Sequence, residues 1–266
     1  EVGPEVKKLK VDDYVVASWI KTSGINAEPA KYRSVKDNKI INGGNITTFS
    51  EYSIISENRL FKKPDSFNLK TATLLGCALP TGAGMVLNEG KPKIHHKILL
   101  IGLGGIGLSA LITLIMLGIK NIDVVEKNEN KLKTAKSLGV TGKLFRTVDN
   151  LKYSNHYDIC FESSGQIEMI EKGFGCINAK GKLIFASHPP KGQLINLDPH
   201  ELIRGKKIFG TWGGGSKPDE IAEKLSELNS LKCLENLLGG TYKLENINEA
   251  LEKLADGKEF RPIIKM

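Results

Sequence analysis

Short apolar runs alternate with longer amphipathic segments over the middle of the chain. Residues 98–101 are an apolar run typical of a strand buried on both faces of a sheet, and residues 121–126 are a second short strand whose apolar positions are Ile122, Val124 and Val125. A helix is expected between them, over residues 105–117. A second helix should begin at Asn128 and end at Gly139. Strand, helix, strand and helix at this spacing predict a parallel sheet with helices on its faces.

The alternation continues toward the carboxyl end. Further strands are expected over residues 157–161, 182–186 and 207–212, with a helix over 167–174. The sequence therefore predicts an α/β fold in which a doubly wound parallel sheet, a Rossmann domain, occupies residues 79–213.

The two ends of the chain have a different pattern. Residues 11–19 and 49–55 are predicted as short strands of a β-rich partial domain over residues 1–78, joined by a long polar stretch. Residues 214–266 are expected to form helices and to return to that domain. One helix begins after Ser216 and another ends at Gly257.

Composition and charge narrow the classes of partner. The 266 residues carry a net charge of +8, but only five of the 38 basic residues are arginine and aromatic residues make up 6%. Nucleic-acid readers concentrate arginine and aromatic side chains on one face, so scattered lysines favour an ordinary solvated surface. We expect no nucleic acid and no membrane as partner. The uncharged run between Lys97 and Lys120 is long enough to span a bilayer. Its glycines, however, divide it into a strand, a turn and a helix.

Cysteine usage and the first residue bear on the compartment. Four cysteines without paired spacing indicate a reducing compartment, here the cytoplasm. The chain starts at Glu1 rather than Met and has no signal-peptide pattern. We therefore expect this chain to be the later part of a longer protein.

A glycine motif lies where the first buried strand gives way to its helix. Gly102, Gly104 and Gly107 have the G-x-G-x-x-G spacing of dinucleotide-binding turns, and Gly105 lies within it. The first glycine permits a tight turn and the second lets a pyrophosphate approach the backbone. The third lets helix and strand pack closely. A turn that binds nothing is the alternative.

Glu126 follows the glycine motif at the end of the second strand. A carboxylate there can accept hydrogen bonds from both hydroxyl groups of the adenosine ribose, and it would repel the 2′-phosphate of NADP. NAD is therefore the expected cofactor, although the neighbouring Lys127 offers a charge that could attract that phosphate.

Four further segments follow one another along the chain: Glu1-Val-Gly-Pro-Glu-Val, Thr48-Phe-Ser-Glu-Tyr-Ser, Gly76-Cys77-Ala-Leu-Pro-Thr81 and Phe260-Arg261-Pro-Ile-Ile-Lys-Met. In this order they resemble the medium-chain dehydrogenase/reductase superfamily, specifically its zinc-containing alcohol dehydrogenase type. The resemblance covers essentially the whole chain. It implies that residues 1–78 are part of a GroES-like catalytic domain, and that the protein binds NAD and one catalytic zinc ion.

The resemblance also implies roles for individual residues. Cys77 matches a zinc ligand, whereas from the residues alone it is a small core side chain. The remaining matches are cofactor contacts: Thr81 and Ile106 beside the nicotinamide ring, Lys131 near the adenosine ribose, Arg261 on the pyrophosphate, and backbone at Ser163, Ser164 and Ala186 along the nicotinamide ribose.

The sequence departs from the family pattern in two ways. No histidine or second cysteine matches the remaining ligands of the catalytic zinc, so we expect this chain alone to be inactive or metal-free. The long loop from Ser18 to Gly44 contains no cysteine, which predicts a lobe without structural zinc.

Three functions remain open from the sequence. The first is NAD-dependent interconversion of an alcohol or polyol and its carbonyl by zinc-assisted hydride transfer, in a homodimer or homotetramer acting on a small molecule. The second is a zinc-independent quinone or enoyl reductase, against which Glu126 and Cys77 argue. The third is a dinucleotide-binding fragment without catalysis.

Overall fold

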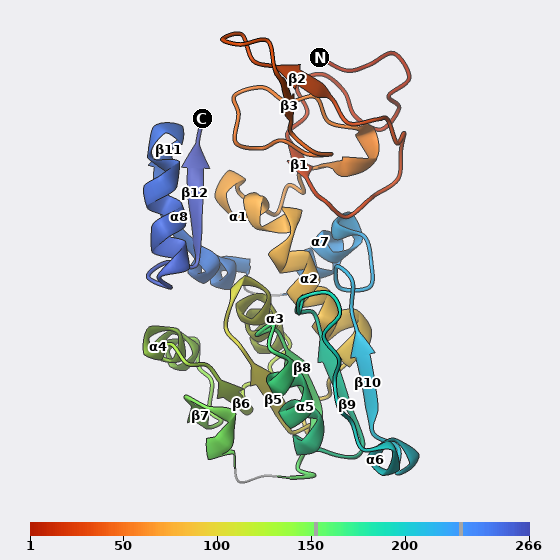
Figure 1. Ribbon diagram of the computed structural model, residues 1–266, viewed down its shortest axis with the longest axis vertical. Coiled ribbons are helices and arrows are strands. Elements are labelled where there is room, and N and C mark those ends of the chain that lie inside the picture. The colour runs from red at the N-terminus through yellow and green to blue at the C-terminus, as the bar shows by residue number, and fades with distance from the viewer. Residues whose placement is uncertain (152–153, 229–230) are drawn as a thin grey trace. The chain divides into compact units, whose positions relative to one another are not determined.

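Six parallel strands form the sheet of the unit that contains residues 78–216 and 227–237. The computed structural model describes residues 1–151, 154–228 and 231–266. The strands are β5 (Ile98–Ile101), β6 (Ile122–Val125), β7 (Leu144–Phe145), β8 (Tyr157–Glu162), β9 (Ile177–Phe185) and β10 (Lys207–Gly210). Figure 1 shows them side by side from β7 at one edge to β10 at the other.

The order of these strands identifies the architecture. It is β10-β9-β8-β5-β6-β7, so the chain winds outward from β5 in one direction and then from β8 in the other. This is the doubly wound arrangement, with its switch point between β5 and β8. The predicted α/β fold with a Rossmann sheet is confirmed.

Helical segments cover both faces of the sheet. Cys160 and Phe161 are neighbours on β8 and therefore point to opposite faces. Gly173 packs against Cys160 on one face, and Gly90 packs against the ring of Phe161 on the other. The helical segments of this unit are α2 (Ala78–Gly84), η3 (Met85–Gly90), α3 (Gly105–Met116), α4 (Glu129–Ser137), η4 (Val148–Asn150), α5 (Ile167–Cys176), α6 (Pro199–Ile203) and η5 (Leu231–Leu237).

Local sequence explains the limits of α4. The side chain of Asn128 accepts hydrogen bonds from the backbone N–H groups of Asn130 and Lys131, and so caps the helix. Gly139 follows the last turn with φ of +92°, a left-handed conformation that ends helices. Both signals were predicted from the sequence.

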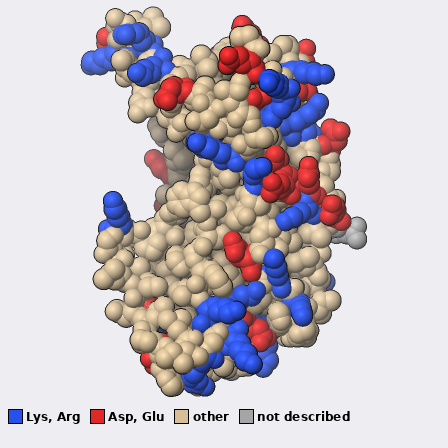
Figure 2. All heavy atoms as spheres, turned by 90° about the vertical axis from the view of Figure 1, so that its right-hand side faces the viewer, with Lys and Arg blue, Asp and Glu red and all other residues tan. Residues whose placement is uncertain are grey.

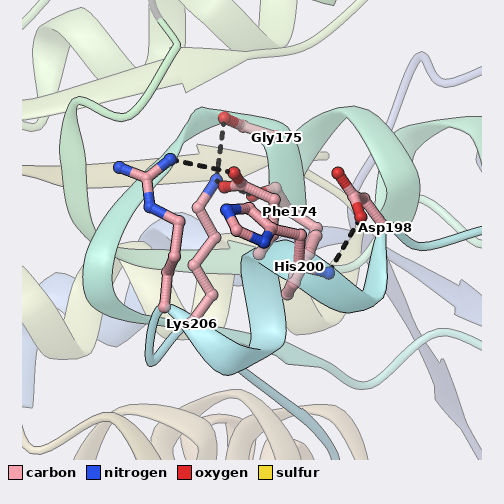
Figure 3. Close-up of polar contacts among 7 residues, drawn as sticks. Phe174, Gly175, Asp198, His200 and Lys206 are labelled. Carbon is pink, nitrogen blue, oxygen red and sulfur yellow. Dashed lines mark hydrogen bonds and ion pairs between the residues drawn. The ribbon is translucent and has the colours of Figure 1, made fainter.

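A buried lysine closes the carboxyl end of α5. The Nζ of Lys206 donates to the carbonyl oxygens of Phe174 and Gly175, at 3.2 and 3.4 Å, and lies 2.6 Å from a carboxylate oxygen of Glu201 on α6. Figure 3 shows this amine directed at the end of the helix. A cation is favourable there because the last carbonyl groups of a helix carry partial negative charge.

The second unit combines residues 1–77, 217–226 and 238–266. β1 pairs with β4 and β2 with β3 in antiparallel fashion, whereas β11 and β12 are parallel. The strands are β1 (Val15–Ala17), β2 (Lys31–Arg33), β3 (Ile40–Asn42), β4 (Leu60–Lys62), β11 (Leu238–Lys243) and β12 (Arg261–Lys265). The helical segments are η1 (Glu57–Arg59), α1 (Leu69–Ala72), η2 (Thr73–Gly76), α7 (Pro218–Ser226), η6 (Leu244–Asn246) and α8 (Ile247–Ala255).

The predicted strand over residues 49–55 is wrong. Residues 49–55 form no strand, and the side chains of Phe49, Tyr52 and Ile54 are 57%, 88% and 73% exposed. The backbone N–H of Ile54 donates to the hydroxyl of Tyr32 rather than to a neighbouring strand. The predicted strand over residues 11–19 is reduced to the three residues of β1.

Two observations bear on nucleic acid and membrane as partners: the distribution of surface charge and the length of the helices. On the face in Figure 2, acidic side chains lie among the lysines and arginines in both the upper and the lower part. Within the described ranges, no helix combines the length and the apolar character needed to cross a bilayer.

Candidate functional site

The carboxyl ends of β5 and β8 lie side by side at the switch point of the sheet. The N–H of Gly102 donates to the carbonyl oxygen of Val125 at 2.8 Å, and the N–H of Ser163 donates to that of Ile101 at 2.9 Å. The loops after β5 and β8 therefore begin at the same edge, where open α/β sheets bind their ligands.

The three glycines of the motif are required for different physical reasons. Gly102 has φ of +86°, which favours glycine. A Cβ on Gly107 would collide with the carbonyl oxygen of Gly102, so only glycine lets α3 start so close to the turn. Gly104 has an ordinary φ of −71°, and a Cβ there would meet no atom within 4 Å. Neither its backbone nor its neighbours in the protein therefore require glycine at position 104.

Open space above Gly104 lies at the amino end of α3. The first N–H groups of a helix have no partner within it, and they carry partial positive charge. Gly104 is the residue that precedes this helix, and Gly105 and Ile106 form its first turn. Open space, free N–H groups and the helix dipole fit an anionic group such as a pyrophosphate.

Glu126 is held at the end of β6 by two backbone groups. Its carboxylate accepts from the N–H of Leu103 at 2.7 Å and from that of Asn128 at 2.9 Å. The residue is 8% exposed. A carboxylate can accept about four hydrogen bonds, so capacity remains for the two hydroxyl groups of a ribose.

Two residues predicted beside the cofactor lie close to this region. Thr81 is buried on α2, and its neighbour Gly82 packs directly against the backbone of Ile106 at the start of α3. Lys131 lies in the first turn of α4, which follows Glu126 and its capping residue Asn128. The structure thus places Thr81, Ile106, Glu126 and Lys131 on elements that meet the carboxyl edge of the sheet.

Ser163, Ser164 and Ala186 follow the two strands beyond the switch point. The hydroxyl of Ser163 donates to the carbonyl oxygen of Gly102 at 3.1 Å. The N–H of Ala186 donates to the carbonyl oxygen of Glu162 at 3.1 Å. These contacts bring the loops after β8 and β9 to the same edge as the glycine motif.

Glu162 and Ser187 belong to this edge and are absent from the residues that the sequence predicts. The Glu162 carboxylate accepts from the N–H of Ser164 and from the hydroxyl of Ser187, both at 2.6 Å. A carboxylate directly after the apolar residues 159–161, at the carboxyl end of the strand, is the signal that could have identified Glu162. Nothing in the pattern around Ser187 marks it.

Cys77 belongs to the other unit, at the junction after η2. Its side chain is exposed, and the preceding Gly76 is close to β1, where a Cβ would lie 2.7 Å from the carbonyl oxygen of Ala17. Among residues 1–151, 154–228 and 231–266, no group of three or more His, Cys, Asp or Glu side chains could hold a metal ion. The described residues therefore do not by themselves complete a zinc site around Cys77.

Arg261 also belongs to that unit, as the first residue of β12. Its Nε is buried and has no hydrogen-bond partner in the described part of the chain. Buried polar groups without a partner are uncommon, and they mark positions where a bound group can complete the hydrogen bonding.

The family model and the curated relative that match this chain are both dehydrogenases. Residues 105–230 match the family model for zinc-binding dehydrogenases. The alcohol dehydrogenase class-2 isozyme 2 of Oryctolagus cuniculus is 31% identical over 229 residues, which are 82% of this chain and 60% of that protein. The chain thus spans about three fifths of the length of this curated relative.

Solved structures share the fold over most of the chain. Benzyl alcohol dehydrogenase from Acinetobacter calcoaceticus has a TM-score of 0.84 at 24% identity, covering 100% of this chain and 81% of its own. Acetophenone reductase from Geotrichum candidum, solved in complex with NAD, has a TM-score of 0.69 at 20% identity and covers 86% and 66%. Together with the order of the sheet and the glycine motif, these matches show that the chain is similar to zinc-binding dehydrogenases and shares its fold with alcohol dehydrogenases.

Proposed function

We propose that this protein is an NAD-dependent oxidoreductase that interconverts a small alcohol or polyol and its carbonyl compound. The observation that carries the proposal is the open space above Gly104, at the amino end of α3 and beside the switch point of the sheet. A glycine that neither the backbone nor the protein interior requires is explained by a ligand that approaches the backbone.

NAD fits this site better than NADP. Glu126 is fixed by its bonds to Leu103 and Asn128, so its carboxylate cannot easily turn away from the ribose position. A 2′-phosphate there would meet a like charge at short range in a partly buried environment. The exposed Lys127 follows Glu126, and its carbonyl oxygen accepts from Arg146 at 3.4 Å.

The roles of the chain's own residues follow from this placement. The first turn of α3 would bind the pyrophosphate, and Glu126 would accept from the adenosine ribose. Lys131 would lie near that ribose, and Arg261 would contact the pyrophosphate. The backbone at Ser163, Ser164 and Ala186 would line the nicotinamide ribose, with Thr81 and Ile106 beside the ring. NAD supplies the hydride acceptor, and the protein supplies orientation and electrostatics.

Zinc is proposed on the family likeness and on Cys77. A zinc ion of this family type would act as a Lewis acid toward the alcohol oxygen. Because the described residues form no group that could hold a metal ion, we assign no catalytic step to zinc. The assembly into a homodimer or homotetramer rests on the family likeness alone.

Binding measurements on three proteins test the proposal. Titration calorimetry of the unaltered chain should show tighter binding of NAD than of NADP. Gly104→Ala should raise the dissociation constant for NAD by about tenfold or more, because the added methyl group occupies the pyrophosphate position. Glu126→Ala should weaken NAD binding and reduce the preference of the protein for NAD over NADP.

The matched control is Gly175→Ala on α5. A Cβ at Gly175 also meets no atom within 4 Å, but that position lies away from the switch point. This variant should bind NAD as the unaltered chain does, and should be slightly more stable, because alanine favours helix by up to about 1 kcal/mol over glycine. Equal NAD affinity in Gly104→Ala and Gly175→Ala, or tighter binding of NADP, would refute the proposal.

A further inference from the structure

Glu162 is a fully buried carboxylate at the last position of β8. One carboxylate oxygen accepts from both the backbone N–H and the hydroxyl of Ser164, the former at 2.6 Å. The other oxygen accepts from the hydroxyl of Ser187 at 2.6 Å. Three donors therefore converge on a group that has no contact with solvent.

The donors come from two different loops. Ser164 follows β8 and Ser187 follows β9, and the carbonyl oxygen of Glu162 also accepts from the N–H of Ala186 at 3.1 Å. Burying a carboxylate is unfavourable unless it is well hydrogen-bonded. Residues 159–161 of the same strand are buried and apolar, so an apolar residue at position 162 would serve the packing equally well. The carboxylate thus links the loops rather than filling the core.

Both loops belong to one half of the dinucleotide site. In a doubly wound sheet each half, of three strands, binds one nucleotide of the dinucleotide. The half made of β5, β6 and β7 carries the glycine motif and Glu126, and it would hold adenosine. The half made of β8, β9 and β10 would hold the nicotinamide nucleotide, and Glu162 links the first two of its strand ends.

The loop after β8 also touches the glycine turn. A Cβ on Gly102 would lie 3.0 Å from the backbone nitrogen of Ser164 and 3.2 Å from the hydroxyl of Ser163. The position of Ser164 is therefore defined from two sides, by the turn and by the Glu162 carboxylate. Movement of this loop would change the surface offered to the nicotinamide ribose while leaving Glu126 in place.

We propose that Glu162 is a positioning residue for the nicotinamide half of the cofactor, acting through Ser164 and Ser187. The inference rests on the proposed function, since it takes NAD as the ligand. It predicts that loss of the carboxylate weakens binding of NAD selectively. ADP, which lacks both the nicotinamide ring and the ribose attached to it, should bind as before, because its contacts lie mainly in the other half.

The test compares dissociation constants for NAD and ADP by titration calorimetry. In Glu162→Ala the NAD constant should rise by about tenfold or more, whereas the ADP constant should change by less than about threefold. Glu162→Gln should restore most of the NAD affinity, because its amide oxygen can accept from Ser164 and its NH₂ can donate to Ser187. Ser187→Ala removes only the link between the two loops and should give an intermediate loss.

The matched control is Asp158→Ala at the opposite end of the same strand. Asp158 also links two segments, since it accepts from the N–H of Lys97 at 2.8 Å and from the side-chain amide of Asn178 at 2.7 Å. This variant should lower thermal stability without changing the ratio of the two constants. Ser187→Ala and Glu162→Gln keep the test decisive if Glu162→Ala does not fold.

The outcomes separate the two proposals. If the unaltered chain binds neither NAD nor ADP, the proposed function fails, and this inference fails with it. If the unaltered chain binds both, but the Glu162 and Ser187 variants lose affinity for both equally or for neither, only the positioning role is refuted.

Discussion

Glu57 shows how one side chain can organise an irregular part of a protein. It is a buried residue whose carboxylate accepts from the N–H groups of Lys7 and Lys8 at 2.8 Å and of Ile25 at 2.9 Å. Hydrogen bonds from Lys8, Ile25 and Lys7 lower the pKa of Glu57 from its ordinary 4.5 to about 2. One carboxylate thus fastens two segments that have no regular secondary structure at those points.

This lowered pKa predicts an acid-dependent loss of stability. Between about pH 4.5 and pH 2 the unfolded chain binds a proton at Glu57 that the folded chain does not bind. The stabilisation is therefore complete above about pH 4.5 and is lost as the pH falls toward 2. Urea unfolding at several pH values across this window should show a steeper decrease in stability for the unaltered chain than for Glu57→Gln, whose side chain does not titrate.

An exposed carboxylate in the same unit provides the comparison. Glu51→Gln changes the net charge by the same amount, but Glu51 is exposed. The free energy of unfolding of this variant should depend on pH as that of the unaltered chain does. Parallel curves for the unaltered chain and Glu57→Gln would show that the three N–H groups do not stabilise the folded carboxylate.

Individual site residues differ in how far the sequence could predict them. Gly102 and Gly107 follow from motif spacing, because the turn and the close packing of helix on strand are local geometry. Glu162 lies 25 positions before its partner Ser187. That hydrogen bond depends on two strand ends meeting at one edge, which spacing along the chain does not reveal.

Among the elements, those of the parallel sheet were the most predictable. The strand predicted over residues 98–101 is β5 itself, and the helix predicted over 105–117 is α3, one residue shorter. Buried parallel strands are apolar on both faces, and helices between them carry an apolar stripe and capping residues. The sequence pattern and the physical environment therefore agree.

The elements near the amino end were less predictable. The hairpin of β2 and β3 was not predicted, and residues 49–55 were wrongly assigned to a strand. Val35, in the hairpin turn, and Ile40 and Ile41, on β3, are exposed, so no alternation of buried and exposed positions marks the hairpin. Single side-chain bonds such as that of Ile54 to Tyr32 determine the path of the chain instead.

The contact between α5 and α6 yields a prediction at the level of elements. Lys206→Met removes the amine that bonds Phe174 and Gly175 and pairs with Glu201. Loss of hydrogen bonds to a buried charged group should lower the free energy of unfolding by about 1.5–3 kcal/mol. Urea denaturation measures this loss, and NAD affinity should not change, because Lys206 precedes β10 and lies away from its carboxyl end.

A double variant separates the capping of α5 from the ion pair with Glu201. In the single variant Glu201 keeps its pair with Arg204 at 3.2 Å, but its other oxygen loses Lys206. Adding Glu201→Gln removes that uncompensated charge and should recover part of the lost stability. If the double variant is as unstable as the single one, the ion pair makes no contribution, and the carbonyl groups of α5 account for the whole effect.

At the scale of the whole molecule, long-range assembly is the part that local pattern does not determine. One unit joins three separate stretches of chain, and the parallel pair of β11 and β12 lies within it. The hydroxyl groups of Ser66 and Ser226 are 2.7 Å apart, although 160 positions separate them in sequence. The division into residues 1–78, 79–213 and 214–266 stays a prediction.

Metal content is the whole-molecule property that the structure allows us to predict. The loop from Ser18 to Gly44 has no cysteine, and it is held by hydrogen bonds that link it to residues 54–58. The N–H of Ala27 donates to the Ser56 hydroxyl at 2.7 Å, and that hydroxyl donates to the carbonyl oxygen of Ile25 at 2.7 Å. These hydrogen bonds hold the loop in place, which is the role that a zinc ion bound by four thiolates has in a structural zinc site.

The chain should therefore fold without a structural metal. After incubation with zinc and desalting, elemental analysis should find no more than about one zinc ion per chain, and any zinc that is retained should be lost in Cys77→Ser. A chelator should leave the thermal unfolding midpoint unchanged, because structural zinc stabilises only the proteins whose fold it completes. Two zinc ions per chain, or a large drop in the midpoint on chelation, would mean that the loop binds metal and that its hydrogen bonds do not suffice.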